Sequence, residues 1–537
     1  MNQALISGAA AHHPLWHITS LHQALLRAAQ QSEKGVTTVN AAGQRRAWSY
    51  AEFYPQALAV SHVLAEKGIS AGDRVLLRLA DPGDFVLALW GCLLLGAVAV
   101  PVAAGVPWPV EPSALKASLA ALALIRPTAM IGSGADLTQF QLIQQQMPEA
   151  AMQVIAAAPF HQLTPRHDPC SYVGQGDDLA IIFPTSGSTG QPKLVTQSVR
   201  ALLSMAAGTA QMNDFSERDV FLNWMPMDHV GAVVFLGIVP VCCAAQQIHL
   251  ATPWVREDLA RFPRETAACR ATVSWVPNHV FSELSQMEAA ADWDFSSLRF
   301  LVNAGESISD QMKRCASRFA AQGLKSSALR PAFGMSETCS GLTWSAGDGG
   351  EYNGYVDLGL PIPAASVRIT DRDGEIVDEG QVGDLQVRGP SVTRGYFNGE
   401  AEDCFLEDGW FVTGDRALLH QGRLFITDRD GDGIAGLPIP GYQLEAELER
   451  IPGVRAGYTG VCQSGETVGI YFVCQPGSSA ESVMRRMEIR LSELGTPLHW
   501  RLFPAETGQI PRTSIGKIQR KVLRRRLAAQ LAQERVE

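Results

Sequence analysis

The sequence lacks the residue clusters that mark several large classes of protein. Its ten cysteines are spread from Cys92 to Cys474 without a C-x-x-C pair or a His/Cys cluster, so neither a zinc site nor a disulfide framework is predicted. No basic segment followed by an apolar stretch opens the chain, so we expect no signal peptide and a cytoplasmic protein. The apolar run from Phe85 to Val100 contains two glycines and is too short for a membrane span, and it is better read as a buried helix followed by a strand.

An excess of positive charge is also missing. The 537 residues carry a formal net charge of -10, which argues against a general nucleic-acid binder. Hydrophobic residues make up 46% and charged residues 18%, a composition typical of globular proteins. At this length more than one domain is expected, and no internal repeat or low-complexity tract suggests a different architecture.

The order of the predicted elements indicates an α/β protein. Helical periodicities alternate with short apolar strands from about residue 20 to 330, which predicts a mostly parallel sheet covered by helices. Short strands separated by Asp-Gly turns then predict a β-rich subdomain at about 350–430. The Asp/Gly-rich segment 428–433 is a predicted hinge. We therefore expect a large N-terminal domain, 1–430, and a small mobile α+β C-terminal domain, 431–537. The predicted strands include 74–79, 97–102, 179–183, 273–276, 300–303, 367–370, 385–389 and 424–427.

A loop between Phe183 and Lys193 has the composition of a phosphate-binding site. Its sequence is Phe-Pro-Thr-Ser-Gly-Ser-Thr-Gly-Gln-Pro-Lys, and no side chain between Thr185 and Gly190 is larger than a hydroxyl-bearing one. Glycines let backbone N–H groups approach a polyphosphate, and hydroxyls add further donors. The loop is not a Walker A motif, because Lys193 follows a proline. A flexible Gly/Ser surface turn is the alternative.

Further segments offer what a reaction of a nucleotide requires. Glu337 stands beside hydroxyl side chains in Phe-Gly-Met-Ser-Glu-Thr, a combination suited to Mg²⁺. Asp415 ends a Thr-Gly-Asp turn, where a carboxylate can accept both ribose hydroxyls, and Arg429 ends the next strand. Lys517 lies in a glycine-containing loop that can bring a cation to developing phosphate charge. Taken singly, such a turn is usually structural and a lone glutamate usually faces solvent.

Taken together and in this order, the motifs resemble the core motifs of the adenylate-forming superfamily, which comprises acyl-CoA synthetases, peptide-synthetase adenylation domains and luciferases. The resemblance covers about residues 45 to 525. It implies that a carboxylic acid attacks the α-phosphate of MgATP, giving an acyl-adenylate and pyrophosphate through positioning and charge neutralisation. The motifs are the loop 185–193, Gly305-Glu306, the segments 333–337 and 383–398, the turn 413–415 and the Lys517 loop.

The resemblance also implies a role for each motif residue. Lys517 would bridge the substrate carboxylate and the α-phosphate, and Asp415 with Arg429 would hold the ribose. The residues that would hold the β- and γ-phosphates are Thr185, Ser186, Gly187, Ser188, Thr189, Gly190 and Lys193, with Glu337 and Thr189 at Mg²⁺. Those that would border the adenine and the rest of the nucleotide are Asn303, Ala304, Gly305, Glu306, Phe333, Gly334, Met335 and Ser336.

Within the superfamily, the segments 223–231, 293–306 and 330–341 are similar to those of stand-alone fatty-acyl-AMP ligases, which load carrier proteins in polyketide and nonribosomal peptide assembly. His229 is either a residue that gates the acyl pocket or a packed, hydrogen-bonded histidine. The region from Val230 to Val239 offers no counter-charge to an α-ammonium group, so we expect a fatty or other non-amino acid, and Asp228, which directly precedes His229, is the alternative counter-charge. Residues near 340–344 would complete that pocket.

The segment 431–441 departs from the family pattern. Relatives carry a basic, glycine-containing loop there, whereas this segment has no Lys or Arg and contains Pro438 and Pro440. Coenzyme A favours basic contacts, so we expect the phosphopantetheine of an acyl or peptidyl carrier protein as the acceptor instead. The basic tail 511–537 is either its docking surface or a solvated helix face. The alternatives are an acyl-CoA ligase and a catalytically silent binding or scaffold homologue.

Overall fold

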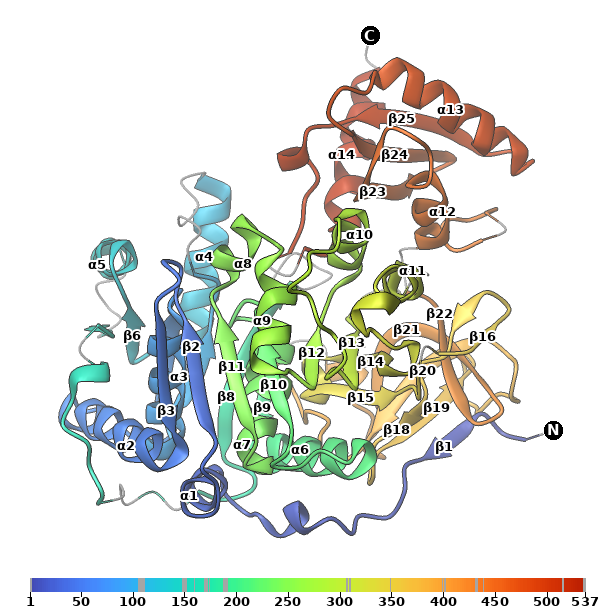
Figure 1. The fold of residues 1–537 in the computed structure, drawn as a ribbon. Coiled ribbons are helices and arrows are strands. Elements are labelled where there is room, and N and C mark those ends of the chain that lie inside the picture. Colours follow the sequence, from blue (N-terminus) through green and yellow to red (C-terminus); the bar gives the residue numbers. More distant parts are fainter. Residues whose placement is uncertain are drawn as a thin grey trace.

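The computed structural model shows an α/β protein in which helices cover two large sheets, with a β-rich part and a separate C-terminal sheet beyond them (Figure 1). This arrangement confirms the predicted fold class. None of the described helices is both long and apolar enough to cross a bilayer. The structure describes residues 2–104, 112–146, 152–158, 160–168, 172, 174–186, 192–305, 308, 311–347, 349–397, 399, 402–429, 433–437, 439–513 and 516–534.

The first large sheet has six strands in the order β7-β6-β4-β5-β8-β9, and all neighbours are parallel except β8 and β9. Between β4 and β5, the apolar run of the sequence forms the fully buried helix α3, which ends at Gly96. Gly96 has φ +79°, a conformation that glycine adopts readily and that commonly ends helices. The strands are β4 (Arg74–Arg78), β5 (Val98–Pro101), β6 (Ala129–Gly132), β7 (Gln153–Ala156), β8 (Leu179–Ser186) and β9 (Pro192–Ser198).

The second large sheet has nine strands in the order β18-β15-β14-β13-β12-β10-β11-β2-β3. The run from β14 to β2 is parallel, and antiparallel strands close both edges. The carboxyl ends of β10, β12, β13 and β14 therefore lie along one edge, where ligands of parallel sheets bind. The strands are β2 (Gly35–Val39), β3 (Arg45–Ser49), β10 (Val220–Asn223), β11 (Gln246–Leu250), β12 (Val273–Trp275), β13 (Phe300–Asn303), β14 (Leu329–Met335), β15 (Ser340–Trp344) and β18 (Leu360–Pro361).

Helices enclose both sheets in a largely continuous hydrophobic core. A π-helix spans Gly231–Ile238 and continues directly into α7. The α-helices are α1 (Leu21–Gln31), α2 (Tyr50–Glu66), α3 (Pro82–Leu95), α4 (Pro112–Ile125), α5 (Ala135–Gln146), α6 (Val199–Asn213), α7 (Val239–Cys243), α8 (Thr252–Glu257), α9 (Arg261–Cys269), α10 (Asn278–Gln286) and α11 (Gln311–Arg318).

The predicted β-rich part is a five-stranded antiparallel sheet in the order β1-β19-β20-β21-β22. Its first strand comes from the beginning of the sequence, because Leu5 pairs with Arg368. Three residues carry too little pattern to predict such a pairing. The strands are β1 (Leu5–Ser7), β19 (Ser366–Thr370), β20 (Gly383–Arg388), β21 (Phe411–His420) and β22 (Arg423–Arg429), and a small hairpin, β16 (Glu351–Tyr352) with β17 (Tyr355–Val356), lies beside them.

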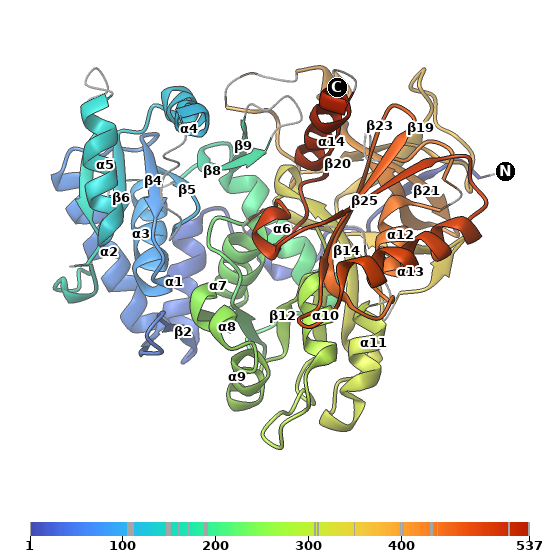
Figure 2. The same cartoon turned by 90° about the horizontal axis from the view of Figure 1, so that it is seen from above.

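The C-terminal elements form an α+β unit with hydrophobic clusters of its own. Seen from above, this unit covers the region of α10 and α11 (Figure 2). Gln311 on α11 donates a hydrogen bond of 3.1 Å to Glu449, which follows α12. The elements are α12 (Gly441–Leu448), β23 (Val454–Ser464), β24 (Thr467–Cys474), α13 (Ala480–Glu493), β25 (His499–Pro504) and α14 (Arg520–Glu534).

Candidate functional site

The predicted phosphate loop lies in the chain between two antiparallel strands, β8 and β9. It follows the buried strand β8, as predicted, and leads into the antiparallel strand β9, which the sequence did not predict. Thr185 and Lys193 are directly opposite each other, and the Thr185 hydroxyl lies 3.5 Å from the Lys193 carbonyl oxygen. Both flank the loop at its two ends. The other loop residues to which we assigned phosphate contacts, Gly187, Ser188, Thr189 and Gly190, and the Ser186 side chain, lie outside the described residues.

The Lys193 ammonium group is linked to Glu337 through a tyrosine that our sequence interpretation missed. Lys193 Nζ lies 3.2 Å from the Tyr396 hydroxyl and 4.9 Å from the centre of its ring. The hydroxyl in turn donates a hydrogen bond of 2.9 Å to Glu337 Oε1. Burial and the neighbouring Glu337 carboxylate raise the pKa of Tyr396, so the phenol stays protonated and remains a donor. Tyr396 lies in the motif segment 383–398, which was the available signal.

Glu337 lies in a short turn between β14 and β15 and is only 6% exposed. Its backbone carbonyl accepts a hydrogen bond of 2.7 Å from Thr393 N–H, and Thr338 ties the turn to Met335 and Ser340. Among the described residues, no three acidic, histidine or cysteine side chains form a ready-made metal cluster. A single fixed carboxylate fits Mg²⁺ that is otherwise bound by phosphate oxygens and water. Phe333, Gly334, Met335 and Ser336 lead directly into this turn.

The predicted adenine segment follows β13, and the catalytic-lysine candidate reaches it from the C-terminal unit. Lys517 Nζ lies 3.2 Å from the Gly305 carbonyl oxygen. Asn303 is fully buried and donates a hydrogen bond of 2.8 Å to Asn278 Oδ1, while its own Oδ1 has no partner within the structure. Ala304, the residue between Asn303 and Gly305, is buried. Glu306, the last residue of the predicted segment, is outside the described part of the chain.

The predicted ribose pair occupies facing positions in the β-rich sheet. Asp415 on β21 is in register with Arg429 on β22. The Thr-Gly-Asp segment does not end a strand at a turn, as we expected, but lies inside β21, because this strand continues to pair with β20 on both sides of a bulge. Gly414 has φ +76° there, and the Thr413 hydroxyl accepts a hydrogen bond of 3.1 Å from Asp415 N–H. The Arg429 side chain lies outside the described atoms, and the backbone alone places the two residues side by side.

His229 lies where the chain leaves β10, half-buried against an aromatic cluster. Its Nδ1 accepts a hydrogen bond of 3.1 Å from Gly231 N–H, and its ring meets Trp275 edge-on at 5.8 Å. Burial and the positive charge of Lys517 lower the pKa of His229 to about 4. The imidazole is therefore neutral at physiological pH, and its proton is on Nε2. The π-helix that follows is buried except at Gly237, and its Phe235 ring packs 5.2 Å from Trp344.

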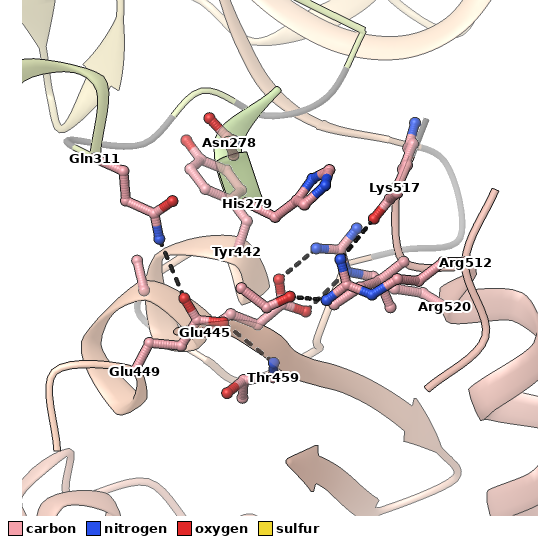
Figure 3. A pocket seen from close by; sticks show the side chains of 14 residues that line it. Asn278, His279, Gln311, Tyr442, Glu445, Glu449, Thr459, Arg512, Lys517 and Arg520 are labelled. Carbon is pink, nitrogen blue, oxygen red and sulfur yellow. Dashed lines mark hydrogen bonds and ion pairs between the residues drawn. The ribbon is translucent and has the colours of Figure 1, made fainter. Parts of the chain in front are cut away.

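A polar cavity of about 70 Å³ lies between the C-terminal unit and the helices α10 and α11, close to Lys517 (Figure 3). Its lining includes His279 from the larger part and Glu445, Glu449 and Arg512 from the smaller part. Burial raises the pKa of Glu449 to about 7, because hydrogen bonds from Gly457 and Thr459 and the nearby Arg512 compensate only partly. The lysine therefore enters the site across a polar and incompletely filled interface.

Known proteins are similar to this chain over almost its whole length. Nonribosomal peptide synthetase apvA of Aspergillus terreus is 26% identical over 94% of this chain and 57% of its own length, and the chain spans about half the length of the curated relatives it matches. The solved structure of McyG A-PCP complexed with phenylalanyl-adenylate is 32% identical, with a TM-score of 0.89 over 99% of this chain and 86% of that one.

A second solved structure, of a keto acid-selecting nonribosomal peptide synthetase module with adenylation, ketoreductase and pseudo Asub domains, is 28% identical. It superposes with a TM-score of 0.88 over 98% of this chain and 47% of its own. The family model described as AMP-binding enzyme matches residues 25–397, well over half of the chain, and this span contains the predicted phosphate loop, Glu337 and Tyr396. The chain belongs to the family of AMP-binding enzymes.

Proposed function

We propose that this protein uses MgATP to convert a non-amino carboxylic acid into an acyl-adenylate, with release of pyrophosphate. The observation that carries the proposal is the position of Lys517 Nζ, 3.2 Å from Gly305 at the carboxyl end of β13. A cation delivered there by a separate unit can neutralise charge as the carboxylate attacks the α-phosphate. The boundary that we propose between the two units is the predicted hinge, 428–433, of which residues 430–432 lie outside the described part of the chain.

The residues around the nucleotide divide the work of binding. Thr185 and Lys193, with the hydroxyls and N–H groups of the loop between them, hold the β- and γ-phosphates. Glu337 ligates Mg²⁺, which neutralises phosphate charge when it is bound. Asp415 and Arg429 hold the ribose, and the segment from Asn303 to Glu306 with Phe333 borders the adenine.

The environment of His229 supports a substrate without an α-ammonium group. A neutral imidazole with its proton on Nε2 donates a hydrogen bond and cannot compensate a positive charge. Burying an ammonium group against this neutral ring would cost several kcal/mol, on the order expected for an unpaired charge, and Asp228, which directly precedes His229, is the carboxylate that would pair with it if the substrate were an amino acid. A 2-oxo acid places a carbonyl acceptor at the same position, and similarity to the keto acid-selecting module supports this class. A fatty acid is the alternative, and its alkyl chain would need space beside the aromatic cluster.

Matched sets of acids test the substrate class. For several side chains, the amino acid, its 2-oxo acid and its unsubstituted acid are compared by pyrophosphate release with MgATP, together with fatty acids of increasing length. We expect 2-oxo acids to be used best and amino acids least. Preference for amino acids would contradict the proposal, and preference for long fatty acids would select the alternative. His229→Ala should lower the rate with 2-oxo acids more than the rate with unsubstituted acids.

For the second step, we propose transfer to the phosphopantetheine thiol of a carrier protein. One structural relative was solved as an A-PCP protein, and α14 presents Lys521 and Arg525 on its exposed surface. Acidic partners favour such a surface. Coenzyme A is the alternative acceptor, and a catalytically silent homologue is disfavoured because Lys193, Glu337 and Lys517 are all in place.

A further inference from the structure

His279, on the first turn of α10, fits into a recess of the C-terminal unit next to Lys517 (Figure 3). The recess is bounded by two glycines, Gly457 and Gly516, with φ of +77° and +83°. A methyl group on Gly457 would lie 2.9 Å from the His279 Cβ atom, and one on Gly516 would overlap the imidazole ring. Only glycine at both positions leaves room for the histidine.

A single arginine of the C-terminal unit connects the two glycines that bound this recess. Arg512 donates hydrogen bonds to the carbonyl oxygens of both Gly457 and Gly516, the latter at 2.9 Å, and its guanidinium group lies 3.9 Å from the centre of the Tyr458 ring. These contacts join β23 to the loop that carries Lys517. The recess is therefore a property of the C-terminal unit, and His279 is the residue that the larger part inserts into it.

The recess is rigidly connected to the lysine. Gly516 precedes Lys517 directly, and Thr513 exchanges two hydrogen bonds with Lys517, one to its N–H at 3.1 Å and one to its carbonyl oxygen at 2.9 Å. A shift of the His279 ring relative to Gly516 would therefore be transmitted to the Lys517 backbone across one peptide bond. The side chain then extends to the Gly305 carbonyl oxygen.

The residue before His279 is connected to the nucleotide side. Asn278 Oδ1 accepts the hydrogen bond of 2.8 Å from Asn303, the last residue of β13, two positions before Gly305. Asn278 and His279 thus contact both partners of the Lys517–Gly305 pair: one holds the strand end, and the other holds the lysine loop.

The interface around His279 is suited to a contact that forms and breaks. The cavity beside it is polar, and His279 Nδ1 and Thr459 Oγ1 are buried there with no hydrogen-bond partner among the described residues. Buried polar atoms without partners are unfavourable, so the docked arrangement is held less firmly than a packed core. Burial, with the charges of Arg512 and Arg256, lowers the pKa of His279 to about 3, so it docks as a neutral ring.

We propose that His279 is a positioning residue that docks the Lys517 loop for adenylate formation and is not needed for transfer of the finished acyl group. The inference rests on the proposed function, because it assigns Lys517 to the first half-reaction. It predicts that His279 acts through the position of Lys517 and makes no contact with the reacting atoms. Displacing a catalytic group by about 1 Å commonly costs a factor on the order of 10² in rate.

Two variants disturb the contact from opposite sides. His279→Ala removes the inserted ring, and Gly516→Ala fills the recess. Gln286→Ala is the matched control on the same helix, because Gln286 is exposed. Gly477→Ala is the control for the glycine, since Gly477 has φ +81° with no atom within 4 Å of an added methyl group, so it carries the same backbone strain without the clash.

Both half-reactions are measured with the acid that the wild-type protein uses best. We expect kcat for acyl-adenylate formation to fall about 10- to 100-fold in His279→Ala and Gly516→Ala, with KM for ATP changed less than about 3-fold. Transfer from preformed acyl-adenylate to pantetheine should stay within about 2-fold of wild type. Both controls should match wild type in both assays, and Gly477→Ala should lower the unfolding temperature by the backbone strain alone, which Gly516→Ala shares.

Equal losses in the two half-reactions would overturn the proposal, because they indicate general damage. An unchanged adenylation rate in both variants would overturn it as well. In those two cases the wild-type protein still forms the adenylate and Lys517→Ala does not, so the proposed function survives alone. A wild-type protein that forms no acyl-adenylate from any acid would refute both.

Discussion

At the scale of single residues, the site depends on side chains whose protonation is set by burial. Tyr396 remains a phenol because it is buried beside the Glu337 carboxylate, and it therefore donates to that carboxylate while Lys193 lies over its ring. His229 remains neutral for the complementary reason, since burial and the Lys517 charge disfavour its cation. Burial thus keeps Tyr396 protonated, so that it donates to an anion, and it keeps His229 uncharged.

Lys517→Ala is expected to reduce acyl-adenylate formation by about 10²- to 10³-fold, because the variant loses the charge that the transition state needs. ATP–pyrophosphate exchange measures this step. Lys521→Ala, an exposed neighbour on α14, is the matched control and should exchange at the wild-type rate. Exchange by Lys517→Ala within a few-fold of wild type would remove the lysine from the mechanism.

Tyr396→Phe is expected to weaken the dependence of the site on Mg²⁺. The ring under Lys193 is kept, but the hydroxyl that accepts from Lys193 and donates to Glu337 is lost, so the carboxylate is less firmly held. Hydrogen bonds to charged groups contribute about 1.5–3 kcal/mol. We therefore expect the factor by which Mg²⁺ strengthens ATP binding to fall by roughly 10- to 150-fold at most. Calorimetric titration of ATP with and without Mg²⁺ reports this directly. An identical Mg²⁺ enhancement in variant and wild type would contradict the role of the tyrosine.

At the scale of elements, strands β10 and β11 hold the start of the His229 segment through a buried amide–imidazole chain. Asn223 Nδ2 donates to His249 Nδ1 at 3.0 Å, and His249 Nε2 donates to Gln247 Oε1 at 2.7 Å. Asn223 Oδ1 accepts from Met225 N–H at 3.0 Å. Both hydrogen bonds of His249 can form only when its ring is neutral, because Nδ1 accepts and Nε2 donates. Burial lowers the pKa of His249 to about 3.

These hydrogen bonds of neutral His249 make the free energy of unfolding depend on pH. In the unfolded protein His249 titrates near 6.5, so above that pH it is neutral in both states. As the pH falls below about 6.5, the unfolded state binds a proton that the folded state refuses, and the free energy of unfolding drops by up to about 1.4 kcal/mol per pH unit. The loss continues toward the folded pKa of about 3. Urea unfolding at pH 7.5, 6.5 and 5.5 measures it.

His249→Gln is the comparison that isolates this contribution, because glutamine can keep an amide partner and does not titrate. Between pH 6.5 and 5.5 we expect the variant to lose about 1 kcal/mol less than wild type. The difference between the two proteins matters, since Glu449 and Asp84 have raised pKa values, of about 7 and 6, and respond in the opposite direction. Parallel pH curves for the two proteins would show that His249 is not held neutral.

Several elements were predictable because their patterns are local. The strand 300–303 was predicted with its observed bounds, and β4, β8, β12 and β19 lie within a few residues of their predicted positions. The π-helix Gly231–Ile238 was not predictable, because a run of apolar residues fits several buried conformations and tertiary packing selects one. We did not predict strand β9, because apolar and polar residues do not alternate clearly along it.

At the scale of the whole molecule, polar contacts join the C-terminal unit to the rest. Lys517 meets Gly305, Gln311 meets Glu449 at 3.1 Å, and Gln443 donates to the Gly354 carbonyl at 2.6 Å. Each part keeps its own hydrophobic clusters, so the interface is not a shared core. Such interfaces are typical of parts that move relative to each other.

The double variant Lys521→Glu/Arg525→Glu tests the acceptor at this scale. Reversing two exposed charges of α14 should slow acyl transfer to an acidic carrier protein by roughly 10-fold at low salt, and less at high salt, because the encounter is electrostatically steered. Adenylate formation and transfer to free pantetheine should be unchanged. Transfer to the carrier that is insensitive to both the variant and the salt concentration would assign α14 to a solvated surface.

Residue type and local pattern were enough to predict the α/β fold and to propose small residues for phosphates, Glu337 for a cation and Lys517 for developing charge. Which of these groups meet depends on how the elements pack. Tyr396 joins Lys193 to Glu337, His279 inserts between two glycines, and Lys517 reaches Gly305, all across gaps of more than 50 residues. Such contacts arise from packing of separate elements, whose geometry no local pattern encodes.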